Sequence, residues 1–157
     1  MENNINITSE NKYLTFKIKD TDYAICVREV KEVLEYSPLT KIPKSSRHLL
    51  GVINLRDKAV PVIDLRSKLE IEPKSEIKAS NILILDREQN ENGSIIGALT
   101  DSVHSVIEIP PDDIEPAQAF SIGMNTRFLH GIGKYNDSFY IVLNIEELLD
   151  TENFAVA

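Results

Sequence analysis

The sequence has a single cysteine, no tryptophan and no long hydrophobic run. Cys26 lies in an apolar stretch and the chain holds no second cysteine for a disulfide, so we expect a buried, reduced thiol. No stretch reaches the roughly eighteen apolar residues of a membrane-spanning helix, and residues 1–11 lack the basic and apolar parts of a signal peptide. These absences predict a cytoplasmic protein with no direct membrane insertion.

Basic residues are also few. The chain has 17 lysines and arginines against 25 aspartates and glutamates, which gives a formal net charge of -8. Binding to nucleic-acid phosphates needs clustered lysine and arginine, and the sequence has no such cluster, so we predict no nucleic-acid partner. The acidic residues are spread along the chain, where they favour solubility and can steer a basic partner.

The common catalytic motifs are absent. The sequence has no glycine-rich phosphate loop, His-Glu-x-x-His, Cys-x-x-Cys or Gly-x-Ser-x-Gly motif. His48, His104 and His130 are far apart, so we predict no metal site, no cofactor and no enzymatic activity. Asp64 and Asp101 follow predicted strands, where capping of backbone amides is commoner than acid–base chemistry. A small hydrolase or ligand-binding barrel that uses Asp64, Asp101 and His104 stays an alternative, which a deep pocket joining them would favour.

The predicted elements are mostly short strands, as in a mainly β fold. Alternating polar and apolar residues predict a first hairpin from Tyr13 to Cys26, and later strands are predicted at 81–86, 94–99, 103–109, 128–134 and 139–144. No internal repeat is evident, but about ten short strands overfill one small barrel, so we expect two sub-barrels in one compact domain. The expected organisation is a disordered lead-in over 1–11, a single domain over 12–150 and a tail over 151–157.

Helical segments are few and short. Val27, Val30 and Leu34 recur at helical spacing and predict a short amphipathic helix, with Glu32 nearly opposite the apolar stripe. One helical turn is predicted at 66–69, and an edge strand at 39–42 between two prolines. The C-terminal segment is predicted to be helical, because Asn144 can cap it and Glu147 follows three residues later, as in a capping box.

The stretch from Gly51 to Asp64 consists of two apolar runs separated by Arg56, Asp57 and Lys58. Valine, isoleucine and leucine dominate both runs, as is typical of strands, and the polar residues between them suit a turn. The stretch predicts a β-hairpin that projects an arginine, and this tip is the first functional candidate.

The order of these segments resembles the CheW family over nearly all of residues 12–150. The resemblance rests on the following stretches: Tyr13–Phe16, Tyr23–Ile25, Val30–Leu34, Gly51–Arg56, Val60–Leu65, Asp101–Val103, Ile114–Ala117, Leu129–Gly133 and Val142–Glu146. It implies two SH3-like five-stranded β-barrels with short helices and a C-terminal helix. It also implies a non-catalytic chemotaxis adaptor, recruited to membrane receptor arrays, that couples the cytoplasmic tips of chemoreceptors to the regulatory domain of the histidine kinase CheA. A chemosensory system for gliding, pili or gene regulation stays an alternative.

Carried over position by position, the resemblance implies a receptor-binding group made of Val30, Glu32, Gly51 and Val106, with Arg56 near the same surface. Each has a plainer interpretation. The two valines suit a core, Glu32 suits a solvated face, Gly51 can relieve crowding at a strand, and Arg56 can form a local salt bridge. We also hypothesise that Glu32 and Arg56 form a pair that orients the receptor site.

For the kinase side we predict the apolar strand that contains Ile82, Leu83 and Ile84, on the premise that its alternate residues cannot all face one core. One position departs from the family. Asp57 stands where the family usually has glycine after the hairpin arginine, so we expect a differently built turn, because aspartate tolerates a positive φ less well.

Overall fold

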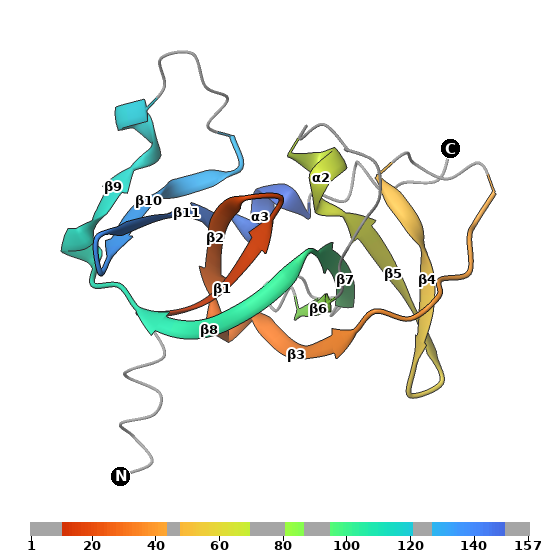
Figure 1. Cartoon of the computed structure of the whole chain (residues 1–157). Helices are drawn as coiled ribbons and strands as arrows, with labels where there is room; N and C mark the ends of the chain where they lie inside the picture. Colours follow the sequence, from red (N-terminus) through yellow and green to blue (C-terminus); the bar gives the residue numbers. More distant parts are fainter. Residues whose placement is uncertain (1–10, 44–47, 70–80, 87–94, 121–126, 150–157) are drawn as a thin grey trace, which may run out of the picture. The chain divides into compact units, whose positions relative to one another are not determined.

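The computed structural model describes residues 11–43, 48–69, 81–86, 95–120 and 127–149, and Figure 1 shows their strands and helices. The expected lead-in over 1–11 lies outside these residues except for its last residue, and the expected tail over 151–157 lies wholly outside them. The chain divides into two compact units: unit 1 contains Met1–Glu29 and Val103–Leu148, and unit 2 contains Val30–Ser102 and Leu149–Ala157. In the described residues no helix is long and apolar enough to cross a membrane.

Unit 1 is built on a six-stranded sheet with the order β8-β1-β2-β11-β10-β9. Its strands are β1 (Lys12–Ile18), β2 (Thr21–Cys26), β8 (Ser102–Glu108), β9 (Ile114–Pro116), β10 (Leu129–Tyr135) and β11 (Ser138–Leu143). Short helical turns are η1 (Val27–Glu29), η2 (Pro111–Asp113), η3 (Ala117–Phe120) and α3 (Ile145–Leu148). The sheet has one strand more than the five expected because the short β9 pairs with β10.

Unit 2 is built on a five-stranded sheet with the order β3-β6-β7-β5-β4. Its elements are β3 (Val30–Glu35), β4 (Leu49–Leu55), β5 (Lys58–Asp64), α2 (Leu65–Lys68), β6 (Asn81–Asp86) and β7 (Ile95–Thr100). The mainly β fold and the strands expected from alternation and apolar runs are confirmed, with ends shifted by a few residues. Of the expected edge strand at 39–42 there is only a single bridge, between Thr40 and Val52.

The predicted amphipathic helix over residues 27–35 is wrong. The segment has one 3-10 turn, η1, and continues as β3, whose residues alternate between half-buried and exposed. Glu32 and Leu34, which pair with Ile84 and Ile82, share one strand face, whereas helical geometry would place them on opposite sides. A bulge between Val30 and Glu32 shifts the register, so Val30 pairs with Leu85 instead.

The two units have the same architecture, although no repeat was evident in the sequence. Both sheets contain an antiparallel hairpin, β1–β2 or β6–β7, whose second strand runs parallel to β11 or β5. Each sheet also contains a second hairpin, β10–β11 or β4–β5, whose register shifts at a glycine, Gly131 or Gly51. The outermost strand and this second hairpin are exchanged: β3, β4 and β5 follow β1–β2 in sequence but form unit 2 with β6–β7, while β8 to β11 follow β6–β7 but join β1–β2 in unit 1. The chain is an interleaved duplication.

The register of the two hairpins matches them residue by residue. The corresponding positions are Gly51 and Gly131, Val52 and Ile132, Asn54 and Lys134, Arg56 and Asn136, Asp57 and Asp137, and Ala59 and Phe139. Both glycines are needed for close packing, because a Cβ on Gly51 would lie 2.5 Å from the Thr40 carbonyl oxygen and one on Gly131 would clash with that of Glu115.

Each unit has an apolar interior. In unit 2 the core cluster comprises Ile53, Val60, Val62, Ile82, Ile84 and Leu99. In unit 1 the Phe16 and Tyr23 rings stack with their centroids 5.8 Å apart, and both side chains are buried. Asn144 caps α3 as predicted, since its Oδ1 accepts a hydrogen bond from the Glu147 amide at 3.3 Å, while the Glu147 carboxylate bonds Arg127 instead of completing the capping box.

Candidate functional site

The predicted arginine hairpin is present as β4 and β5, which lie side by side in Figure 1 and join at a two-residue tip, Arg56 and Asp57. Both tip residues are left-handed, with φ of 50° and 69°. Positive φ at both central residues defines the type I′ turn, whose twist suits a hairpin. The Asp57 amide donates a hydrogen bond to the Asn54 side-chain oxygen at 2.8 Å, so the turn is held from within and Asp57 adopts a conformation that favours glycine.

The expected pair between Glu32 and Arg56 is confirmed. Arg56 Nη1 lies 2.6 Å from Glu32 Oε2, with the Arg56 side chain 72% exposed and that of Glu32 27% exposed. The hydrogen bond to Glu32, and then the negative charge of Glu32, raise the pKa of Arg56 above its ordinary value. The guanidinium is therefore charged, positioned and open to solvent.

This pair also indicates that the unit 2 sheet is rolled. Glu32 is on β3 at one edge of the strand order, and Arg56 follows β4 at the other edge. A 2.6 Å contact between opposite edges requires the sheet to roll until its edges approach, as in a small barrel. Leu34, on the same face of β3 as Glu32, packs against the core cluster, as does Leu55 of β4.

The other proposed receptor-binding residues lie in different surroundings. Val30 is half-buried and pairs with Leu85, across a bulge from Glu32, and Gly51 is buried in β4, where its hydrogen is the only side chain that fits beside Thr40. Val106 is on β8 of unit 1 and is 48% exposed, so the core interpretation of this valine is wrong. Glu32 and Arg56 are the pair that the structure brings into contact.

The kinase-binding prediction treats part of this strand as available for contact, but all four residues from Ile82 to Leu85 are buried, at 1% exposure or less. Strand β6 lies between β3 and β7, and its Ile82 and Ile84 are in the core cluster. Both faces of β6 are therefore covered, as in an interior strand. Kinase contact by Ile82, Leu83 and Ile84 stays a prediction, without exposed side chains to support it.

In the alternative site of Asp64, Asp101 and His104, both carboxylates have structural roles. Asp64 caps α2, where its Oδ1 accepts a hydrogen bond from the Arg66 amide at 3.0 Å. Asp101 forms an ion pair of 2.6 Å with the Arg66 guanidinium, which is buried. His104 is exposed on β8 of unit 1. Arg66 thus engages both carboxylates, and among the described residues no three acidic, histidine or cysteine side chains are placed to hold a metal.

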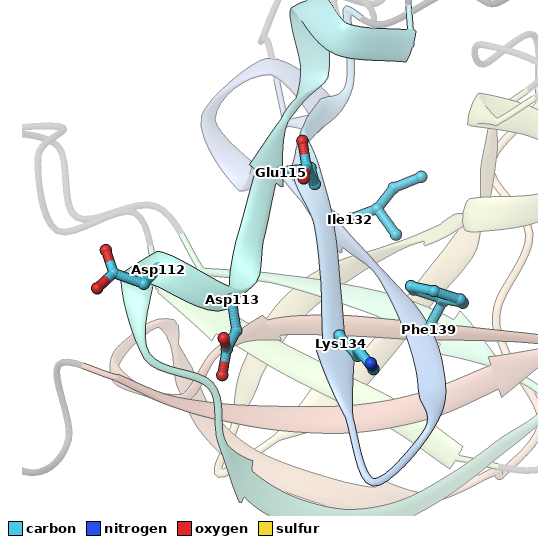
Figure 2. A pocket seen from close by; sticks show the side chains of 6 residues that line it. All are labelled: Asp112, Asp113, Glu115, Ile132, Lys134 and Phe139. Atoms are coloured by element: carbon cyan, nitrogen blue, oxygen red, sulfur yellow. The ribbon is translucent and has the colours of Figure 1, made fainter.

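Sequence reasoning missed a pocket on unit 1, shown in Figure 2. It encloses about 460 Å³ and is lined by Asp112, Asp113, Glu115, Ile132, Lys134 and Phe139. Phe139 was included in a predicted strand, yet its side chain is 66% exposed. An alignment of this hairpin with the earlier one would have drawn attention to Phe139, because alanine occupies the corresponding position there.

These features define a class: a protein of two small, mainly β units, each a rolled sheet of the SH3-like type, with a charged hairpin tip open to solvent. The model of the CheW-like domain matches residues 12–153, and the chain belongs to this family.

Relatives with established names agree with this assignment. The chain is 30% identical to the chemotaxis protein CheW of Klebsiella aerogenes, over 95% of this chain and 87% of that protein. It is also 30% identical to CheW of Helicobacter pylori, over 88% and 81% of the two chains. The crystal structure of the scaffolding protein TtCheW from Thermoanaerobacter tengcongensis superimposes with a TM-score of 0.78 at 32% identity, covering 90% of this chain and 93% of that one.

Proposed function

We propose that this protein is a non-catalytic chemotaxis adaptor that joins the cytoplasmic tips of transmembrane chemoreceptors to the regulatory domain of the histidine kinase CheA, and so works in the cytoplasm at membrane receptor arrays. The observation that carries the proposal is the exposed Glu32–Arg56 pair in a chain of the CheW-like family. The names of the relatives, which are chemotaxis and scaffolding proteins, support it.

On the receptor side, the pair acts through its geometry. A surface salt bridge adds little to stability. We therefore infer that this pair serves to orient its charged groups. The Glu32 carboxylate holds the guanidinium of an otherwise exposed arginine, which leaves donors of Arg56 available to a carboxylate or carbonyl of a receptor helix. Half-buried Val30 adds apolar area at the start of the same strand. Gly51 contributes by letting β4 approach Thr40, and Val106 by an exposed apolar side chain.

On the kinase side, Ile82, Leu83 and Ile84 support the surface from within. Their burial means that they determine the shape of the unit 2 sheet, and a kinase domain would contact the residues that this sheet presents. Substitution of these residues would therefore lower kinase binding together with stability.

The test is titration of the protein into CheA and, separately, into a receptor cytoplasmic fragment. Replacement of Arg56 by alanine is expected to weaken receptor binding about tenfold and to leave kinase binding and folding intact, because hot-spot arginines are worth roughly that much. The matched control is Lys58→Ala, which removes the same charge from an exposed neighbour at the tip.

A second pair of variants tests the orientation of the site. Glu32→Arg alone should weaken receptor binding, because it places two like charges together. The proposed pair has no role if a Glu32→Arg change leaves receptor affinity intact. The same holds if Lys58→Ala weakens binding as much as Arg56→Ala, because the tip would then act only through its total positive charge. Binding to neither partner would overturn the adaptor function.

A further inference from the structure

The pocket on unit 1 has a counterpart on unit 2. Side chains that differ between the two pockets are not required by the shared fold. Glu115 pairs with Ile132, and Lys134 pairs with Phe139, so these four side chains share one face of neighbouring strands. The matching face of unit 2 presents Thr40, Val52, Asn54 and Ala59, and these residues line a smaller pocket of about 290 Å³.

Three of the four side chains differ in kind between these faces. Phe139 replaces alanine, Lys134 replaces asparagine and Glu115 replaces threonine, while Ile132 replaces another β-branched apolar residue. The unit 2 hairpin has the same register with alanine, so the architecture does not require a phenylalanine at this place. An aromatic side chain that is 66% exposed beside a hollow is instead typical of a contact surface.

The charge around the ring indicates the chemistry of its partner. Three carboxylates, those of Asp112, Asp113 and Glu115, surround the hollow with one ammonium group, that of Lys134. Figure 2 shows the acidic residues on η2 and β9, next to the β10–β11 hairpin that carries Lys134 and Phe139. Within the described ranges none of the three carboxylates forms an ion pair, and all three residues are exposed.

A cation near the face of a phenyl ring is attracted by its quadrupole, and neighbouring carboxylates add a direct charge interaction. The apolar floor of Ile132 and Phe139 adds contact area for an aliphatic or aromatic group. Lysine and arginine combine an alkyl stem with a cationic head, so they fit both parts of the pocket.

We propose that this acidic, phenylalanine-lined pocket is a docking site for a protein segment in which a lysine or arginine lies beside an apolar side chain. The site is on unit 1 and uses none of the Glu32–Arg56 geometry, so it stands independently of the receptor contact proposed above. It gives the adaptor a further surface with a charge preference opposite to that of the arginine tip.

The test uses a short synthetic peptide that alternates lysine and leucine, titrated into the full-length protein and followed by backbone amide NMR. Amide signals of Ile132 and Lys134 are expected to shift. Affinity should fall about tenfold in Phe139→Ala, which removes the ring, and at least as much in Glu115→Lys, which reverses one charge of the rim. Phe139→Tyr keeps an aromatic face and should retain binding.

The charge-matched control is Glu108→Lys, which makes the same change in net charge at an exposed residue outside the pocket lining. It should change affinity by less than about twofold. The proposal is overturned if the peptide does not bind, if a peptide alternating glutamate and leucine binds as well, or if Glu108→Lys weakens binding as much as Glu115→Lys. None of these results bears on Arg56→Ala and the receptor fragment, so the two proposals fail separately.

Discussion

Two residues in a left-handed conformation make each of the long hairpins turn. Arg56 and Asp57 do so in unit 2, and Asn136 and Asp137, with φ of 50° and 63°, do so in unit 1. Asparagine and aspartate tolerate this conformation better than most residues, but glycine adopts it at no steric cost. The side chain of Arg56 is directed at Glu32 even though its own backbone is strained.

Replacement of Asp57 by glycine should therefore stabilise the protein by about 0.5–1 kcal/mol, because it relieves the left-handed strain and keeps the amide bond to Asn54. Urea unfolding measures the change. Asp137→Gly is the matched variant and should give a similar gain, since its φ is nearly the same. A loss of stability in both variants would contradict the strain argument.

At the scale of elements, β6 shows that the position of a strand in a sheet determines how far its side chains are buried. Its apolar run was interpreted as partly exposed, but the strand lies between two others and both of its faces are covered. Segment 27–35 shows the same effect in the other direction: hydrogen bonding to β6 draws it into a strand despite helical spacing. Register and neighbours override local spacing in both cases.

Truncation of the buried Ile84 to alanine is expected to cost about 2–4 kcal/mol, through lost burial and the cavity left in the unit 2 core. Val33→Ala, at a position on adjacent β3 that is 40% exposed, should cost less than about 1 kcal/mol. Chemical denaturation compares the two variants. Equal losses would mean that the β6 face is not the core that its burial indicates.

At the scale of the whole molecule, interleaving makes each unit depend on both halves of the chain. Unit 1 joins β1 and β2 to the strands from β8 onward, and unit 2 joins β3, β4 and β5 to β6 and β7. Parallel ladders connect the halves in both units, between β2 and β11 and between β5 and β7. Neither half of the sequence therefore contains a complete sheet.

A cut placed between residues 70 and 80, by an inserted protease site, should leave the two fragments associated, because four strand contacts join them across both sheets. The fragments are expected to elute together in size-exclusion chromatography and to separate in urea. Separate elution without denaturant would show that one half holds its own sheet, contrary to the exchanged positions of β3 and β8.

The sequence by itself determined the mainly β class, the hairpin and its arginine tip, and the Asn144 cap, because alternation, turn residues and caps act over a few neighbouring residues. The opposite charges of Glu32 and Arg56, and their expected solvent-facing positions, led to the prediction of their pair. Only the tertiary structure decided the strand identity of β3, the burial of β6, the exchanged strands and the exposure of Phe139. Those features depend on which segments pair across long sequence separations, and local periodicity carries no information about that pairing.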